Sequence, residues 1–536
     1  MKRRTWKLVA LALGLVLALA ACSTGGPTQT PGQSEDGVEL TWQVMSDVTA
    51  LDPAFAYDGP TMAVMLQVTE GLLTLTPEGE IIPCLAESWE ASDPTTYVYN
   101  LRQDVTFSDG NAMTMDDVLY SLERYRDPEV ASYLSWMYDN VESIQQTGDW
   151  QITVKLKEAD ACFKYVFATA AGHVVEKKYC EEKGADFGKP NGLIVGTGPY
   201  VVDQWNVGSS VVLVKNDKYW DKNYSDLKVS KVTYNVISED TTRAAAMTSG
   251  QSDIDTILPG DLYDQFASSD KMHVVLKPSN DFLFLSMNCE KEPFTDVNVR
   301  RALACAVDKQ SIHDNIIKES GTVANSLPMT ESLFTFEKES WQEYAETAQD
   351  YKYDMDKARE YLAASAYPDG FEADLMVSEQ SQMNAVALTI QQSLAERGIT
   401  VNIQKVSNDE LIAMEFGGVM EGGIRAYDMA LFQWEADWPD PSGNTMGVFN
   451  SAYMGEGGTN IPSYSNPQVD ELLNKQASIT DEKERTELLQ QALDIIIDES
   501  PLVPISYTNY MIGLSNRIEQ FDMITWVSFI KDLKLK

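Results

Sequence analysis

Hydrophobic and polar positions follow two different periods along the chain. The strand pattern, with apolar residues at every second position or in short runs, occurs at residues 38–44, 97–101, 211–214, 232–236 and 282–287. The helix pattern, with apolar residues every three or four positions, occurs at residues 61–73, 299–318, 385–397 and 483–499, and a further helix begins at residue 115. Repeated alternation of strands and helices with short connections predicts an α/β fold built of lobes.

Two of these helices are preceded by residues that favour a helix start. Thr114 stands directly before the helix that begins at residue 115, and Thr480-Asp481 stands before the helix at 483–499. An oxygen at this position accepts a hydrogen bond from an N–H group of the first helical turn. We therefore expect both helices to begin where these side chains cap them.

One stretch combines a buried-strand pattern with candidate chemistry. Residues 429–432 form a short apolar run, and the prolines at 439 and 441 then forbid regular structure. Two tryptophans and three carboxylates lie in this region: Trp434, Trp438, Glu435, Asp437 and Asp440. Tryptophan offers flat contact area, and a partly desolvated carboxylate attracts a cationic group, so the loop is a candidate wall of a ligand site. The alternative is a strand end with a packed tryptophan and solvated acids.

The N-terminus has the composition of an export signal. Residues 1–21 contain a basic start and an apolar segment at 8–20 that is too short for a comfortable membrane span. The sequence Leu19-Ala20-Ala21-Cys22 looks like a bacterial lipobox, which implies a lipid on Cys22. Residues 22–36, rich in Ser, Thr, Gly and Pro, predict a flexible tether. We expect a protein anchored to the outer face of the cell membrane; a plain secretory signal is the alternative.

The length and charge of the chain indicate the number of lobes and exclude some classes of partner. Roughly 500 residues follow the tether, more than one ordinary core holds, so two or more lobes are expected. The chain has 41 Lys and Arg against 81 Asp and Glu. This excess of negative charge argues against nucleic acid and anionic lipid as partners.

The residues that usually form metal or catalytic sites are scattered. The three histidines, at 173, 273 and 313, lie far apart in the sequence and fit no metal-ligand spacing. Phosphate-binding glycine loops and the usual hydrolase motifs are absent from the sequence. We therefore expect no metal and no cofactor. One or two disulfides remain open among the cysteines that follow the lipobox, Cys84, Cys162, Cys180, Cys289 and Cys305.

A set of short motifs occurs in a fixed order over nearly all of residues 38–536. The motifs lie at residues 51–54 (Leu-Asp-Pro-Ala), 70–72 (Glu-Gly-Leu), 83–89, 107–110, 196–200 (Gly-Thr-Gly-Pro-Tyr), 240–250, 299–303 and 434–441. In this order they resemble family 5 solute-binding proteins, the oligopeptide, dipeptide and nickel receptors of ABC importers. Gln433 stands where the family usually has Gly. The resemblance implies a receptor and not an enzyme, working as a monomer with a membrane permease.

The resemblance also implies a fold and a domain layout. The expected fold is two-lobed, like that of periplasmic binding proteins (class II, cluster C), with an extra inserted domain and a hinge between the lobes. The expected divisions are lobe I at residues 37–67, 190–280 and 501–536, inserted domain II at 68–189, and lobe III at 281–500. The chain would cross between lobes I and III near 279–282 and 499–501, and a ligand would bind between the lobes.

Site residues follow from the motif positions. Asp437 stands where peptide receptors of the family hold the α-amino group of the ligand, and Trp434 and Trp438 flank it. Phe284 matches an aromatic position on the strand that opens lobe III. Asp255 and Thr256 match polar contacts from lobe I. For Trp434 and Phe284 the alternative is plain core packing.

Two departures from the family pattern leave the ligand open. Leu431 occupies the position where some oligopeptide receptors have an arginine for a tripeptide carboxylate. The segment 376–394, where dipeptide receptors use an arginine, has none. A C-terminal clamp is therefore not visible, and longer peptides or a non-peptide solute, such as an oligosaccharide, a metal chelate or an opine-like compound, stay open. An extracytoplasmic hydrolase using paired carboxylates is the alternative from a different class.

Overall fold

The computed structural model describes residues 37–536 except 57, 416–419, 422–423 and 525–526. The expected signal at 1–21, the lipidation site Cys22 and the tether at 22–36 lie outside the described residues. Residues Glu39–Lys536 form one compact unit. Within the described residues, no helix combines the length and apolarity that crossing a bilayer requires.

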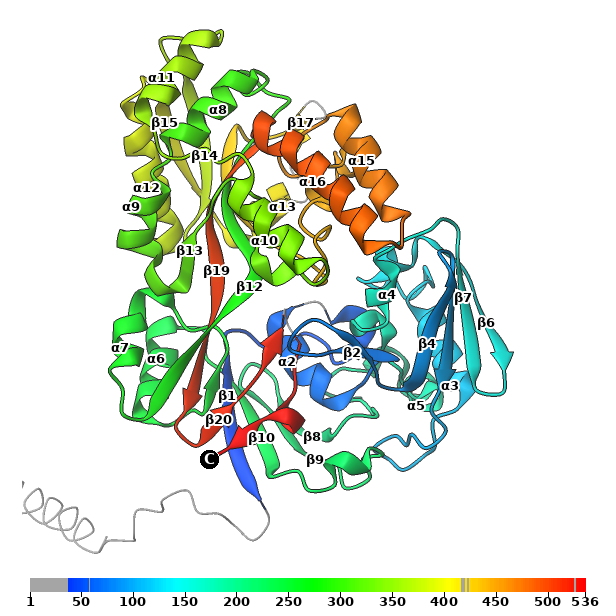
Figure 1. Ribbon diagram of the computed structural model, residues 1–536. Coiled ribbons are helices and arrows are strands. Elements are labelled where there is room, and N and C mark those ends of the chain that lie inside the picture. The colour runs from blue at the N-terminus through cyan, green and yellow to red at the C-terminus, as the bar shows by residue number, and fades with distance from the viewer. Residues whose placement is uncertain (1–36, 57, 416–419, 422–423, 525–526) are drawn as a thin grey trace, which may run out of the picture. The chain divides into compact units, whose positions relative to one another are not determined.

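A large mixed sheet runs through this unit (Figure 1), in the order β15-β14-β18-β12-β19-β11-β1-β10-β9-β8, with β13 joined to β19. Parallel pairs occur between β14 and β15, between β14 and β18, and between β1 and β11, as expected for an α/β fold. Its strands are β1 (Val38–Val44), β8 (Tyr200–Asn206), β9 (Ser210–Lys215), β10 (Val229–Val236), β11 (Ile254–Asp255), β12 (Met272–Met287), β13 (Gly321–Val323), β14 (Glu372–Ser378), β15 (Thr400–Val406), β18 (Met429–Glu435) and β19 (Leu502–Ser515).

Two long strands join the two halves of this sheet. β12 and β19 pair along their length, and Figure 1 shows them running side by side, in green and red. At one end β19 pairs with β11, and at the other end β12 pairs with β18. The register between β12 and β19 shifts between Pro278 and Phe282, opposite Tyr507–Asn509. Residues 502–506 of β19 pair with residues 283–286 of β12, which belong to the segment expected as lobe III. The sequence prediction assigned residues 502–506 to lobe I.

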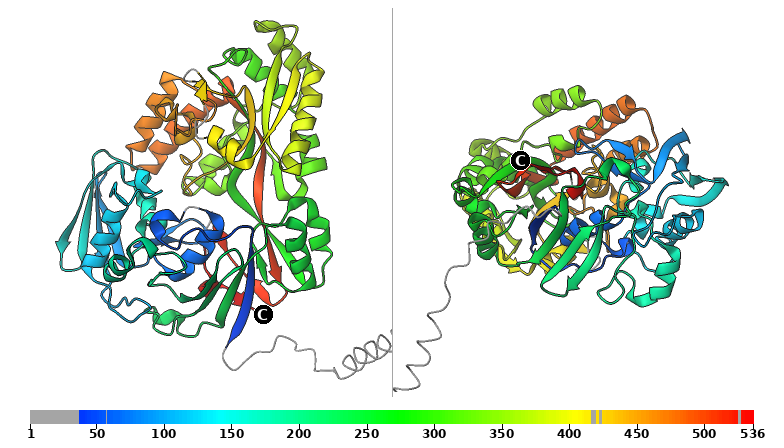
Figure 2. Two further views of the ribbon diagram at one scale, coloured as in Figure 1. Left: turned by 180° about the vertical axis from the view of Figure 1, so that it is seen from behind. Right: turned by 90° about the horizontal axis from the view of Figure 1, so that it is seen from below.

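A separate four-stranded antiparallel sheet lies within the segment expected to be an insertion. Its strands, in the order β4-β5-β7-β6, are drawn in blue and cyan in Figures 1 and 2. Helix α3 (Met115–Arg124) contacts β6. The strands of this sheet are β4 (Ala86–Asp93), β5 (Thr96–Leu101), β6 (Val141–Gly148) and β7 (Gln151–Leu156).

Helices around β14, β15 and β18 enclose an extensive hydrophobic core. α12 (Ser381–Ala395) contacts β14 and β15, and α8 (Val297–Ala306) packs on α11 (Met355–Ala364) and α16 (Glu482–Glu499). This core includes the buried run of residues 429–432 on β18. The sequence patterns at 385–397 and 483–499 thus correspond to α12 and α16.

Two expected helices differ from the structure. The helix expected at 299–318 is interrupted, because α8 ends at Ala306 and Asp308 caps a new helix, α9 (Lys309–Ile312), by accepting a bond from the Ser311 amide at 2.9 Å. The helix expected at 61–73 is α2 (Gly59–Val68), which ends where Thr69 adopts an extended backbone. The spacing of apolar residues alone does not reveal where such local groups end or begin a helix.

Further helices and strands lie between and beside these parts. The remaining helices are α4 (Phe163–Val166), α5 (Lys177–Lys183), α6 (Asp240–Ser249), α7 (Tyr263–Ala267), α10 (Lys338–Thr347), α13 (Asn408–Glu415), α14 (Met446–Phe449) and α15 (Pro467–Ala477). The remaining strands are β2 (Leu73–Leu75), β3 (Ile81–Pro83), β16 (Met420–Glu421), β17 (Ile424–Arg425), β20 (Ile518–Gln520), β21 (Met523–Ile524), β22 (Val527–Ser528) and β23 (Lys534–Leu535).

Candidate functional site

The loop after β18 is held in place by a buried ion pair. Asp440 is fully buried, and the Arg485 guanidinium reaches its two carboxylate oxygens at 2.9 and 3.1 Å. The Ser442 hydroxyl donates to the same carboxylate at 2.6 Å. Burial alone would raise the pKa of Asp440, but the attraction of Arg485 and these hydrogen bonds hold it below its usual range. Asp440 therefore fixes the loop and is not available to a ligand.

Two further carboxylates sit where β12 and β18 meet. Asp281 lies opposite Glu435 in the strand pairing, and it accepts hydrogen bonds from Gln433 Nε2 and Thr508 Oγ1, both at 3.0 Å. Tyr510 donates its hydroxyl to Glu435. Burial raises the pKa of Asp281 to about 7. Burial and the neighbouring Asp281 charge raise the pKa of Glu435 to about 8.

Glu415, at the end of α13, belongs to the same negative region. Burial raises its pKa to about 8, and the charge of Asp281 adds to this effect while that of Arg425 opposes it. Asp437 in turn contributes to the raised pKa of Glu435. Burial is the main cause of these raised pKa values, and repulsion from Asp281 adds to it at Glu415 and Glu435, so a further negative charge is disfavoured in this region.

Asp437 lines a cavity formed by segments far apart in the sequence. Its side chain is half-buried. The second carboxylate on this cavity is Asp58, which also caps α2 by accepting a hydrogen bond from the Thr61 amide at 2.9 Å. The same carboxylate accepts a hydrogen bond from the Thr49 hydroxyl at 2.9 Å. The other lining residues are mostly apolar: Ala56, Gly59, Met62, Leu134, Met137, Thr169 and Ala170. Two carboxylates beside an apolar wall suit an ammonium group attached to a short apolar chain.

The two tryptophans of the loop have different surroundings. Trp434 is buried in the core of β18, opposite Phe282 in the strand pairing. Trp438 is half-buried, and its ring lies 5.9 Å from that of Trp136, centroid to centroid. Nearby, the Tyr165 hydroxyl donates to the Pro439 carbonyl oxygen at 3.1 Å. The segment that carries the small sheet thus contacts the loop directly.

Asp255 and Thr256 line a second cavity. Asp255 is buried and accepts hydrogen bonds from Gln43 Nε2 at 2.9 Å, Arg243 Nε at 3.3 Å and the Ile257 amide at 3.0 Å. Burial raises the pKa of Asp255 to about 6, although Arg243 opposes this shift. The remaining lining residues are Trp42, Val44, Met45, Gly59, Pro60, Ala63, Met523 and Ser528. Gly59 lines both this cavity and that of Asp437, so the two cavities adjoin.

Phe284 lies away from both cavities. Its side chain is fully buried, 4.9 Å from the ring of Phe282 and 6.3 Å from that of Phe432. In this structure it packs in the core behind the loop. The residues that sequence reasoning missed as site candidates are Asp58, Arg243, Asp281 and Glu415. Asp58 gives only a helix-cap signal in the sequence, and no local pattern links the others to the site.

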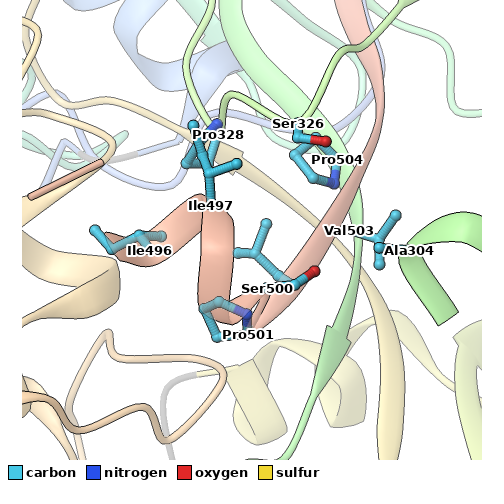
Figure 3. A pocket seen from close by; sticks show the side chains of 10 residues that line it. Ala304, Ser326, Pro328, Ile496, Ile497, Ser500, Pro501, Val503 and Pro504 are labelled. Atoms are coloured by element: carbon cyan, nitrogen blue, oxygen red, sulfur yellow. The ribbon is translucent and has the colours of Figure 1, made fainter. Parts of the chain in front are cut away.

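Other hollows of the structure differ in character. A cavity of about 10 Å³, with room for about one water molecule, is lined by Ile496 and Ile497 of α16 and by Val503 and Pro504 of β19. Figure 3 shows the side chains that line it. A larger hollow of about 460 Å³ borders β2, β3 and the C-terminal strands. There Lys531 is paired with Glu70 at 3.4 Å, so its charge is already compensated.

The cysteines and histidines form no cluster within the described chain. Cys84, Cys162, Cys180, Cys289 and Cys305 are all free thiols. Burial lowers the pKa of His173 to about 3, and its Nδ1 lies 2.8 Å from the Thr69 hydroxyl. Among the described residues, no group of three or more His, Cys, Asp and Glu is placed to hold a metal ion.

Comparison with known proteins gives consistent matches. The model of the bacterial extracellular solute-binding proteins, family 5 (middle), matches residues 80–456. The glutathione-binding protein GsiB of Salmonella paratyphi A is 30% identical over 467 residues, covering 86% of this chain and 87% of that protein. Heme-binding protein A of Haemophilus influenzae is 27% identical and covers 94% of both chains.

Comparison with a solved structure identifies the fold. The ABC transporter-associated periplasmic binding protein DppA from Helicobacter pylori, in complex with peptide STSA, superposes with a TM-score of 0.77 at 25% identity. The match covers 93% of this chain and 98% of that one. The predicted two-lobed α/β fold is thereby confirmed.

Proposed function

Because this chain belongs to family 5 of the bacterial extracellular solute-binding proteins, we propose that it captures peptides between its two lobes and delivers them to an ABC importer. It acts as a receptor and not as an enzyme. The complex of DppA from Helicobacter pylori with the peptide STSA supports a peptide ligand for a chain of this fold.

The observation that carries this proposal is the cavity that Asp437 and Asp58 share. The α-amino group of a peptide binds there, with Asp437 as its main partner. A hydrogen bond to a charged group contributes about 1.5–3 kcal/mol net. The desolvation of both charges offsets part of the attraction, so the apolar wall of Met62 and Leu134 supplies the rest by burying the adjoining side chain.

Opening of the lobes admits the ligand. The two cavities measure about 30 and 50 Å³, far below the roughly 300–1,000 Å³ of ordinary ligand pockets. The divisions proposed from sequence, lobe I (37–67, 190–280, 501–536), domain II (68–189) and lobe III (281–500), place the hinge on β12 and β19. The register shift between Pro278 and Phe282 supports a hinge at this point, because the regular pairing of the two strands is interrupted there.

The setting of the receptor follows from the sequence. A lipid on Cys22 anchors the receptor to the outer face of the cell membrane, and residues 22–36 form a flexible tether between the anchor and the folded part. The receptor works as a monomer beside its permease. Treatment of the expressing cells with an inhibitor of lipoprotein signal cleavage, and the variant Cys22→Ser, test this part. Release of the Cys22→Ser protein into the soluble fraction is expected, and equal membrane retention would contradict it.

A non-peptide solute is the second candidate. Heme-binding protein A is similar along 94% of this chain, which shows that relatives of this length have different ligands. The discriminating experiment is mass spectrometry of the ligand that co-purifies with the full chain, followed by titration with a peptide found and its N-acetylated form. Unaltered peptides, with binding lost on acetylation, support the proposal. Retention of a non-peptide solute alone, or cleavage of added peptides, contradicts it.

A further inference from the structure

The cavity lined by Asp255 and Thr256 carries buried polar atoms that no other described residue satisfies. These atoms are Trp42 Nε1, Gln43 Oε1 and Arg243 Nη1. All three residues line the cavity, and each side chain is at most 2% exposed. Buried polar groups in proteins are nearly always hydrogen-bonded, so three unsatisfied atoms around one cavity indicate a group that binds there.

The Arg243 guanidinium is fixed with one nitrogen left over. Its Nε donates to Asp255 at 3.3 Å, and its Nη2 donates to the Ile257 carbonyl oxygen at 3.0 Å and contacts Asp240 at 3.0 Å. Asp255 and Ile257 themselves line the cavity. The guanidinium therefore lies at the cavity wall, and Nη1 is the donor that remains for a ligand.

The orientation of the Gln43 amide is equally determined. Its Nε2 donates to the Arg243 carbonyl oxygen at 3.0 Å and to Asp255 Oδ2 at 2.9 Å. Both partners are acceptors, so a flipped amide would place oxygen against oxygen. Gln43 Oε1 is consequently an acceptor that can take a hydrogen bond from a ligand.

Charge decides which ligand group fits. The single positive charge of Arg243 is already opposed by Asp255 and Asp240. A carboxylate would add a third negative charge and would also face the lone pairs of Gln43 Oε1. A neutral carboxamide or peptide unit accepts from Arg243 Nη1 with its oxygen and donates to Gln43 Oε1 with its N–H, with no added charge.

We propose that this cavity is a subsite for a neutral amide group of the ligand, held by Arg243 and Gln43 with Trp42 as a second donor. The inference rests on the proposed function, because the cavity adjoins that of Asp437 at Gly59. A cavity of about 50 Å³ takes one such group and not a whole peptide. The ligand then has an ammonium group in one cavity and an amide unit in the next, and needs no C-terminal carboxylate.

The first experiment measures retention of a randomised tetrapeptide library by the full chain, in free-acid and C-terminally amidated forms. We expect both forms to bind within threefold of each other. Trp42→Phe and Arg243→Lys should each weaken retention at least fivefold. Trp42→Phe removes no hydrogen bond within the described protein, so it remains informative if Arg243→Lys impairs folding. Trp205→Phe is the matched control, because Trp205 Nε1 is also buried and unpartnered but lies outside both cavities.

The second experiment soaks crystals with acetamide and, separately, with acetate. Acetamide bound between Arg243 and Gln43, with no acetate there, is expected. Acetate in the same place, or wild-type retention by both Trp42→Phe and Arg243→Lys, would overturn the subsite. If the wild-type protein retains no peptide at all, the proposed peptide function fails, while the acetamide soak still decides the subsite.

Discussion

Three carboxylates within six residues, one at the end of β18 and two in the loop after it, have different roles because their surroundings differ. Asp440 is buried against Arg485, Glu435 accepts the Tyr510 hydroxyl, and Asp437 faces a cavity. From the sequence they are equivalent acids beside tryptophans. Only the position of Arg485, forty-five residues away on α16, separates the structural acid from the candidate for ligand binding.

Replacing Asp440 should damage the fold and not only the site. Asp440→Asn leaves the Arg485 charge buried without its partner, and removing one member of such a pair costs about 3–5 kcal/mol. Denaturant unfolding of the empty protein measures this loss. The matched change Asp437→Asn should cost less than about 1 kcal/mol, since Asp437 is half-buried. Equal midpoints for wild type and Asp440→Asn would show that the ion pair is dispensable.

The acids at the strand junction predict a pH dependence of stability. The pKa values of Asp281, Glu415 and Glu435 in the folded protein, about 7, 8 and 8, lie above the ordinary values near 4. Between about pH 4 and 8 the folded protein therefore binds more protons than the unfolded chain. Their contribution to stability is present at low pH and is lost as the pH rises through 7–8.

Comparison of wild type with Asp281→Asn isolates this contribution from that of other groups. The stability of wild type relative to the variant should fall between pH 5 and 8.5, measured by urea unfolding at fixed ionic strength. A difference that stays constant over this range would mean that Asp281 titrates at an ordinary pKa.

At the scale of elements, capping explains both the successes and the failures of the sequence predictions. Thr114 and Asp481 begin α3 and α16 as expected, with Thr114 forming a capping box with Asp117. The prediction of one continuous helix at 299–318 is wrong, because Asp308 caps a second helix within this range. The apolar period extends across this break, so periodicity alone could not locate it.

Removal of the capping group at α3 should have a modest, local cost. Thr114→Ala deletes the bond to the Asp117 amide at 3.2 Å, and such losses cost about 1 kcal/mol. Thermal unfolding should show the lower stability, and Thr114→Ser should restore most of it because the hydroxyl is kept. A Thr114→Ala protein as stable as wild type would mean that water replaces the cap.

At the scale of the whole molecule, the sequence motifs predicted the two-lobed fold and selected Asp437 as a ligand-binding candidate, and the structure shows that this residue lines a cavity. They could not supply the other half of the site. Asp58 comes from the start of α2, and Arg243 reaches the end of β1 from α6. Contacts between residues 200 or more positions apart depend on the tertiary packing of the chain, which leaves no local pattern in the sequence.

Closure of the lobes is the movement that such a site requires. The rings of Trp136 and Trp438 meet between the segment of the small sheet and the loop after β18. We expect peptide binding to lower the radius of gyration measured by small-angle scattering. Trp136→Ala should speed ligand release, observed by stopped-flow fluorescence, more than it slows binding. An unchanged radius with a tightly bound ligand would contradict closure.

The most direct measurement is calorimetric titration of wild type and Asp437→Ala with a peptide that co-purifies with the protein. Asp203→Ala, an exposed acid elsewhere, controls for net charge. Binding should weaken at least tenfold in Asp437→Ala, about 1.4 kcal/mol or more, with the fold intact by circular dichroism and with Asp203→Ala unaffected. Unchanged affinity in Asp437→Ala would remove this carboxylate from the site and contradict the proposed function of the cavity.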